Sequence, residues 1–360
     1  MSLASAAAVF QNLDPERYDA IPIRINKDGR WVLPSAAPRL TSAAEVIRAL
    51  TSGGGSDAKV EDERDAQLVP RPGGTDGERG SRNELVAGVG LDVVFPALHG
   101  PYGEDGSVQG LLELANVPYV GAGVLASAVG MDKAAMKLVF AAKGLPICNY
   151  EVVLKHEWKK NEHSVLNTVV SRLGFPVFVK PANLGSSVGI SKARHAVELR
   201  AAIALAAEFD RKVIVEAAVP NAREIECSVL GNVEPEASVA GEIVPSREFY
   251  DYESKYIDDG SVPLIPAPLS EAQAADVRAL SIAAFKAIDG AGMARVDFLL
   301  ARDSGVLYLN EVNTIPGFTT IGMYAKLWAA SGLDFPRLVD RLIALALERH
   351  GEKQQLRTSM

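Results

Sequence analysis

Residues 295–313 read RVDFLLARDSGVLYLNEVN and decide the expected fold of this 360-residue chain. Two apolar runs flank Asp303-Ser304-Gly305, which is the pattern of an antiparallel hairpin with glycine in the left-handed position of a three-residue loop. In that register Asp297 faces Glu311, and Arg295 faces Asn313. The stretch therefore predicts a sheet that presents paired polar side chains.

Two carboxylates directly opposite each other destabilise a sheet, so this pairing predicts a cation nearby. Glu311 and Asn313 are two residues apart on a strand and therefore share a face with each other. Oxygen ligands of this kind suit magnesium. The alternative is a surface hairpin with solvated charges, and the apolar residues on both strands argue against it.

A second polar group follows the apolar strand expected at residues 177–180. Lys180 ends that strand and needs an anionic partner if it is buried. Gly185-Ser186-Ser187-Val188-Gly189 comes next, and loops of glycine and serine expose N–H groups and hydroxyls that can cover phosphates. Glycine- and serine-rich turns are also common between secondary-structure elements, so the prediction of a phosphate site depends mainly on Lys180.

Other candidates lie near the ends of apolar runs. Glu216 ends the run 213–216, and Glu224 follows closely; both suit a nucleotide base and ribose, while a satisfied buried hydrogen bond is the alternative. Residues 249–256 mix aromatic and charged side chains and predict either a functional lid or a surface loop. His99 lies just past a predicted strand at 91–96, where open α/β sheets bind ligands, although a lone histidine in a turn is more often structural.

Composition bounds the remaining possibilities. A chain of this length with 48% hydrophobic residues is longer than one hydrophobic core usually organises, so two or three domains are expected. Net charge is −8 with no basic block, which argues against a nucleic-acid surface. Apolar stretches are broken well short of the roughly 20 residues of a spanning helix. Without a basic segment before Met1-Ser2-Leu3-Ala4 we expect no signal peptide and a cytoplasmic location. Cys148 and Cys227 are expected to be buried.

The expected architecture is α/β (α+β), with helices at 2–10, 108–115, 132–143 and 334–350 and a parallel open sheet near the N-terminus. Predicted domains are residues 1–121, 122–214 and 215–360. Residues 51–81 carry almost no large apolar side chains and predict an exposed insertion in the first domain.

Taken together, the motifs resemble the D-alanine:D-alanine ligases of the ATP-grasp superfamily over nearly the whole chain. They are Leu98-His99-Gly100 with Gly103-Glu104-Asp105-Gly106, Gly130-Met131-Asp132-Lys133, Val179-Lys180-Pro181, residues 185–189, residues 249–256 and residues 310–317. The resemblance implies an ATP-grasp fold behind a Rossmann-like N-terminal domain. It also implies a homodimer that joins two D-alanines through an acyl phosphate for peptidoglycan synthesis.

The resemblance also implies roles for particular residues. Lys133, Lys180 and Ser187 would contact ATP phosphates, Glu216 the adenine side and Glu224 the ribose. Asp297, Glu311 and Asn313 would hold two magnesium (or manganese) ions. Arg295 and the backbone at Gly317 would stabilise developing negative charge, and Ser186 with Tyr256 would close the site. His99, Lys255 and Gly322 would contact D-alanine.

The chain departs from the family pattern in two places. Met1 aligns just after the family glutamate that holds the first substrate's amino group, so the first strand of the family is expected to be missing. Gly322 stands where the family has a serine, which leaves only a backbone N–H for the second carboxylate. Alternatives are an ATP-grasp carboxylase or ligase with another amine donor, and a nucleotide-binding protein without catalysis.

Overall fold

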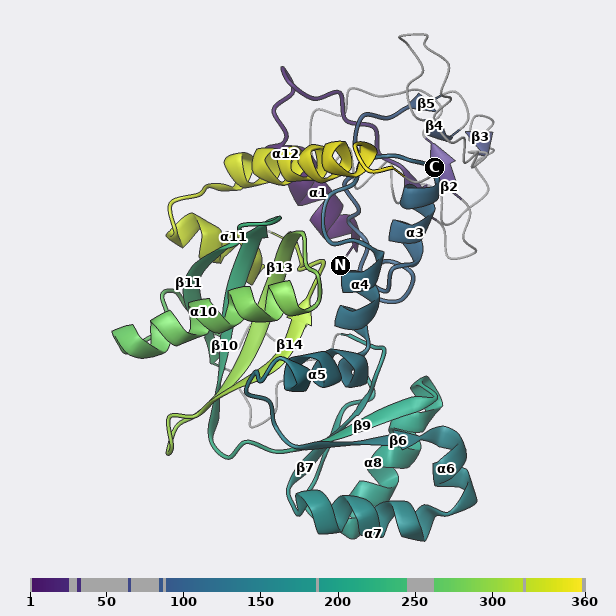
Figure 1. Cartoon of the computed structure of the whole chain (residues 1–360), viewed down its shortest axis with the longest axis vertical. Coiled ribbons are helices and arrows are strands. Elements are labelled where there is room, and N and C mark those ends of the chain that lie inside the picture. The colour runs from purple at the N-terminus through teal and green to yellow at the C-terminus, as the bar shows by residue number, and fades with distance from the viewer. Residues whose placement is uncertain are drawn as a thin grey trace, which may run out of the picture.

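The computed structural model describes residues 2–25, 31–33, 64–65, 84–86, 89–185, 188–244, 262–319 and 322–357. Several predicted features lie outside the described residues: Ser186, Ser187, the segment 249–256 with Lys255 and Tyr256, and all of the insertion 51–81 except Arg64–Asp65. Figure 1 shows the helices and sheets of the described parts.

The N-terminal region holds two helices and short strands. The predicted helices at 2–10 and 108–115 are confirmed as α1 (Ser2–Asn12) and α3 (Ser107–Leu114). Buried Val108, Leu112 and Ala115 recur at helical spacing and face a small core with Tyr119. The strands are β1 (Arg24–Ile25), β2 (Trp31–Leu33), β3 (Arg64–Asp65), β4 (Glu84–Val86) and β5 (Val89–Gly90).

These short strands differ from the expected parallel sheet. The three-stranded sheet β1-β2-β3 and the pair β4-β5 are antiparallel. Within the described residues of this region, parallel pairing is confined to one bridge between Val94 and Tyr119. Among the described residues, the strand predicted at 91–96 pairs through that bridge. Local apolar content predicted extended backbone there, but strand pairing depends on partners elsewhere in the chain.

The central region is a four-stranded antiparallel sheet in the order β6-β9-β7-β8. Helices α7 and α8 pack their apolar residues on it in one core (Figure 1). Two helices precede this sheet, α4 (Val124–Met131) and α5 (Lys133–Ala142). The sheet and its helices are β6 (Tyr150–Leu154), α6 (Lys155–Lys160), α7 (Glu162–Leu173), β7 (Val177–Pro181), β8 (Ser191–Ala193), α8 (Ala196–Phe209) and β9 (Lys212–Ala217). The predicted boundary after residue 214 falls inside β9.

The start of α5 follows directly from its sequence. The Asp132 carboxylate accepts the N–H groups of Ala134 and Ala135, which is the N-cap contact that begins a helix. Gly144 follows the helix with a φ of 68°, a conformation that glycine adopts without strain. The helix predicted at 132–143 is thereby confirmed.

The C-terminal region is a five-stranded antiparallel sheet in the order β12-β11-β10-β13-β14. One face packs against α10 through Val229, Val296 and Phe285, and the other packs against α11 and α12 through Leu230 and Met293. The elements are β10 (Ala222–Gly231), β11 (Glu236–Val244), β12 (Val262–Leu264), α10 (Glu271–Ala287), β13 (Gly292–Ala301), β14 (Leu307–Asn313), α11 (Met323–Ala330) and α12 (Phe335–Gln354).

Two expectations from composition can be compared with this fold. Cys148 and Cys227 are buried and unpaired, as predicted. Among the helices of the described ranges, none is both long and apolar enough to cross a bilayer.

Candidate active site

The β13–β14 hairpin has the predicted register. Asp297 is paired with Glu311 and Arg295 with Asn313, and an irregularity follows Asp297. Gly305 has a φ of 69°, as the three-residue loop requires. The sequence therefore places four polar side chains correctly at one end of the hairpin.

Arg295 binds the carboxylate of Asp297 with two parallel hydrogen bonds. Its Nε and Nη2 atoms each lie 2.7 Å from an Asp297 oxygen, and Nε lies 3.2 Å from Glu226. Burial by itself would lower the pKa of Arg295, but the charges of Asp297 and Glu226 raise it well above its usual value. Arg295 is thus a permanently charged guanidinium held by acidic neighbours.

Lys133 supplies a second cation beside the hairpin. Its Nζ lies 3.6 Å from Glu311 and donates a 2.7 Å hydrogen bond to the carbonyl of Leu184. The opposed carboxylates Asp297 and Glu311 are therefore each beside a cationic side chain. The sequence predicted a metal cation beside this like-charge pair; the structure places the side-chain cations of Arg295 and Lys133 there.

The donor set still fits a hard divalent ion. Three carboxylates, those of Glu226, Asp297 and Glu311, face two cationic side chains, and all the predicted ligands present oxygen. The Oδ1 atom of Asn313 here accepts the N–H of Ile315 at 3.1 Å. In the described residues no group of three or more histidine, cysteine, aspartate or glutamate side chains is arranged to hold a metal ion.

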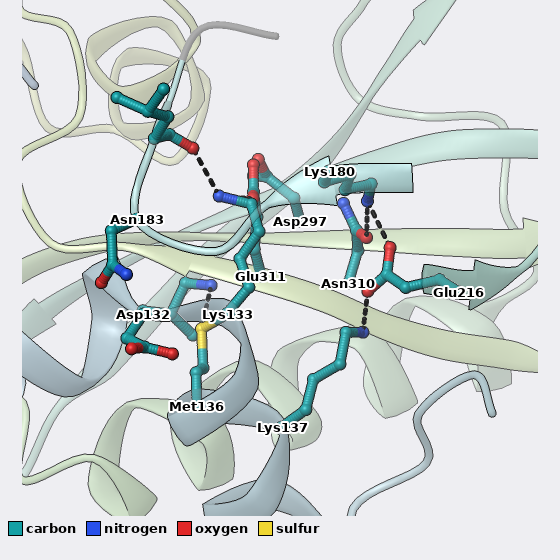
Figure 2. Close-up of polar contacts among 12 residues, drawn as sticks. Asp132, Lys133, Met136, Lys137, Lys180, Asn183, Glu216, Asp297, Asn310 and Glu311 are labelled. Atoms are coloured by element: carbon teal, nitrogen blue, oxygen red, sulfur yellow. Dashed lines mark hydrogen bonds and ion pairs between the residues drawn. The ribbon is translucent and has the colours of Figure 1, made fainter. Parts of the chain in front are cut away.

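A buried cluster of Lys137, Glu216 and Lys180 lies beside the hairpin (Figure 2). One Glu216 oxygen is 2.8 Å from Lys137 Nζ, and the other is 2.5 Å from Lys180 Nζ. Burial would raise the pKa of Glu216, but Lys137 and Lys180 lower it to about 2. Burial would lower the pKa of Lys180, whereas Glu216 and Glu311 raise it. Glu216 and Lys180 are therefore charged at neutral pH.

Helix α5 is attached to both sheets, so it brings the lysines and the hairpin together. The backbone N–H of Lys133 donates to Ala182 beyond β7, and the N–H of Val312 in β14 donates to the Met136 sulfur at 3.3 Å. Lys180 on β7 also reaches Asn310 on β14 at 3.5 Å. Figure 2 shows these side chains converging from α5, β7, β9, β13 and β14.

Sequence reasoning identified Lys133, Lys180 and Glu216 but missed Lys137 and Asn310. A signal for Lys137 was present, because it follows Lys133 by four residues and so lies on the same side of the helix. The sequence places Lys137 within the helix expected at 132–143 and gives it no role. Its burial, with 1% of its surface exposed, depends on the sheet that packs over it.

His99 lies in a second polar group that contains residues of α1. His99 Nε2 is 2.9 Å from Ser5 Oγ, and that same oxygen accepts the N–H of Phe318 at 3.2 Å. The backbone N–H of His99 donates to Ser2 Oγ at 3.1 Å. Ser2 and Ser5 were missed, because nothing in their local sequence indicates contact with residues 94 and more positions away.

Gly317, Gly322 and Glu224 are the remaining predicted site residues that the structure describes. The N–H of Gly322 donates to Thr319 at 2.9 Å, so it already has a partner in this conformation. A Cβ atom at Gly322 would lie 2.5 Å from the Gly317 carbonyl oxygen, which excludes a serine with this backbone. Glu224 lies on β10 opposite Leu299 of β13 and is half-buried.

The chain is similar to known proteins over nearly its whole length. A family profile described as "D-ala D-ala ligase N-terminus" matches residues 1–122, and one described as "D-ala D-ala ligase C-terminus" matches residues 139–344. D-alanine–D-alanine ligases from Geobacillus thermodenitrificans and Heliobacterium modesticaldum are each 49% identical; the alignments cover 99% of this chain and 94% and 93% of the relatives.

Two solved structures are also similar. The D-alanine–D-alanine ligase from Coxiella burnetii has a TM-score of 0.81 and 34% identity, covering 98% of this chain and 91% of that one. The VanG D-Ala:D-Ser ligase from Enterococcus faecalis has a TM-score of 0.80 and 32% identity, covering 96% and 94%. The similarity therefore extends over both the sheets and the helices that form the candidate site.

Proposed function

This chain belongs to the D-alanine–D-alanine ligase family, and from that premise we propose how its residues join two D-alanines at the expense of ATP. The observation that carries the proposal is the convergence of three cations on the β13–β14 hairpin: Lys133 beside Glu311, Arg295 on Asp297, and Lys180 at the amide of Asn310. Fixed cations beside oxygen ligands are what phosphoryl transfer requires, because its catalysis depends mainly on positioning and charge stabilisation.

In this proposal ATP lies between the two sheets. Lys133 and Lys180 contact its phosphates, and the residues 185–189, including Ser187, cover them. Glu216 lies on the adenine side and Glu224 on the ribose side. The contact between Lys180 on β7 and Asn310 on β14 supports this placement, since it brings the two sheets together at the cluster.

Asp297, Glu311 and Asn313 would hold two magnesium (or manganese) ions. When bound, such ions neutralise phosphate charge and polarise the transferred group. The pairing of Asp297 with Glu311 and of Arg295 with Asn313 across the hairpin supports this assignment, because it gathers their oxygen atoms at one end of the sheet.

The reaction has two steps. A carboxylate oxygen of the first D-alanine attacks the γ-phosphorus of ATP, the bond to ADP breaks, and an acyl phosphate forms. The amine of the second D-alanine then attacks the acyl carbon, phosphate leaves with its bonding electron pair, and the amine loses a proton. Arg295 and the backbone N–H near Gly317 stabilise the negative charge that develops on oxygen.

The remaining roles concern substrate binding and closure. His99 contacts the first D-alanine, while Lys255 contacts the carboxylate of the second, as does the Gly322 N–H once it leaves the Thr319 carbonyl. Ser186 and Tyr256 close the site and exclude water. The enzyme acts as a cytoplasmic homodimer and supplies D-alanyl-D-alanine for peptidoglycan.

Phosphate release with ATP, magnesium and D-alanine tests the proposal. We expect release that requires D-alanine, with D-serine, D-lactate and L-alanine as second substrates run in parallel and the dipeptide identified by mass. Preferred use of D-serine would instead favour the activity named for the Enterococcus faecalis structure. A protein whose melting temperature rises with ATP and magnesium, without phosphate release or response to D-alanine, would be a nucleotide-binding protein and would contradict the proposal.

A further inference from the structure

The side chain of Lys137 is buried, which is unusual for a lysine. It lies on α5, one turn after Lys133, and is 1% exposed. Its ammonium is 2.8 Å from one oxygen of Glu216, while Lys180 takes the other oxygen at 2.5 Å. Figure 2 shows Glu216 between the two lysines, with Lys180 on the side of Asn310 and the hairpin and Lys137 on the opposite side.

Burial of an ammonium group is costly unless it is paired. One lysine would suffice to neutralise one carboxylate, and Lys180 already lies within hydrogen-bonding distance of Glu216. With Lys137 present, two lysines share one carboxylate and the trio keeps a net charge of +1. Without Lys137, the charge of Lys180 would be cancelled by Glu216.

We propose that Lys137 is a positioning residue for ATP binding, acting through Glu216. It neutralises and orients the Glu216 carboxylate, which leaves the positive charge of Lys180 available to the phosphates. This inference rests on the ATP-binding roles proposed for Lys180 and Glu216. Lys137 itself does not contact the nucleotide, because it lies behind Glu216.

Other charged groups around Glu216 leave this assignment unchanged. The neighbouring thiol of Cys148 has a raised pKa caused first by burial, so it is neutral at neutral pH. Glu311 acts on Lys180 from β14 and is itself beside Lys133. Among the described residues, Lys137 and Lys180 are the two cations in contact with Glu216.

Steady-state kinetics of Lys137→Met test the inference. Loss of one net positive charge near the phosphates is expected to raise KM for ATP roughly tenfold, with kcat and KM for D-alanine changed much less. Lys137→Arg keeps the charge and should recover most of the ATP affinity. Lys143→Met removes an exposed lysine at the end of the same helix and should leave all three parameters unchanged.

A double-mutant cycle tests whether Lys137 acts through Glu216. The rise in KM for ATP caused by Lys137→Met should be much smaller in a Glu216→Gln background, because the carboxylate to be neutralised is gone. An equal rise in both backgrounds would overturn the inference, as would an unchanged KM for ATP in folded Lys137→Met. If Lys180→Met leaves KM for ATP unchanged in an active enzyme, the proposed ATP site itself is wrong.

Discussion

Glu311 contacts a cationic side chain and is also a proposed metal ligand. It lies opposite Asp297 in the hairpin and 3.6 Å from Lys133 on α5. Removing it would leave Lys133 and Arg295 with fewer carboxylates to hold them and would remove a proposed metal ligand. Its loss should therefore affect ion binding more than folding, since the side chain is partly exposed.

Glu311→Ala is expected to reduce turnover at least 100-fold and to weaken manganese binding in the presence of ADP, because one oxygen ligand is lost. Manganese binding is measured by electron paramagnetic resonance, and turnover by phosphate release. Asp303→Ala, which removes an exposed carboxylate from the loop of the same hairpin, serves as control. Undiminished manganese binding by Glu311→Ala would remove Glu311 from the metal site.

Ser5 connects three segments through one oxygen atom. It contacts His99 Nε2 and accepts the N–H of Phe318, next to Gly317, while lying on α1 with 1% of its surface exposed. With one acceptor position taken by the Phe318 N–H, the hydroxyl still has its hydrogen and a second lone pair, so it can pair with either tautomer of His99. Ser5 can therefore set both the orientation of the histidine and the path of the Gly317 backbone.

Ser5→Ala is expected to raise KM for D-alanine severalfold and to lower the free energy of unfolding by about 1–3 kcal/mol, because a buried N–H loses its partner. Initial rates and urea unfolding measure the two effects. In a His99→Ala background the KM effect should shrink. If the KM for D-alanine rises equally in both backgrounds, Ser5 does not act through His99.

At the scale of elements, the start of β13 is tightly packed against the segment that precedes α4. Gly292 has a φ of 70°, and a Cβ atom there would lie 3.1 Å from both the Cα and N atoms of Gly121. Both neighbours are backbone atoms, which cannot rotate away as a side chain can. Gly305 has nearly the same φ, 69°, but no atom within 4 Å of an added Cβ.

Alanine substitutions at Gly292 and Gly305 can distinguish the cost of backbone strain from the cost of a steric clash. Gly305→Ala should lower the free energy of unfolding by about 1 kcal/mol, because only the left-handed conformation is strained. Gly292→Ala should cost about 1–3 kcal/mol more, because the methyl group also displaces the Gly121 backbone. Chemical denaturation of both variants measures the difference. Equal losses would mean that the Gly121 contact is not restrictive.

At the scale of the whole molecule, the lysine–glutamate cluster connects the two large sheets. Glu216 is on β9, Lys180 on β7 and Lys137 on α5, and Lys180 also reaches Asn310 on β14. Burial opposes the charge of Glu216, and the two lysines outweigh burial and lower its pKa to about 2. Its ionisation is therefore coupled to the stability of the assembled fold.

A group with a lowered pKa in the folded state contributes stability above its unfolded pKa and loses it as pH falls through the folded value. The Glu216 contribution should thus be complete above about pH 4.5 and should disappear toward pH 2. Melting temperatures of the wild type and Glu216→Gln across this range test it. The wild type should lose more stability than the variant; parallel curves would show that the two lysines do not hold the carboxylate ionised.

Much of the fold and site was predictable where the signal was local. The loop Asp303-Ser304-Gly305 fixed the hairpin register, and the register fixed which polar residues face each other. Asp132 and Gly144 bounded α5 in the same way. Roles that depend on contacts between distant segments were not predictable, as Ser5 with His99 and Lys137 with Glu216 show.

The sequence by itself determined several helices, the hairpin register and, through its motifs, the family of ATP-dependent ligases to which the chain belongs. Caps, turns and the alternation of apolar residues act over a few positions, so they can be read along the chain. Only the tertiary structure decided that Lys133 and Arg295 relieve the opposed carboxylates and that a second buried lysine holds Glu216. Charge balance in a buried site depends on distances between elements, and those distances exist only once the sheets and α5 have packed together.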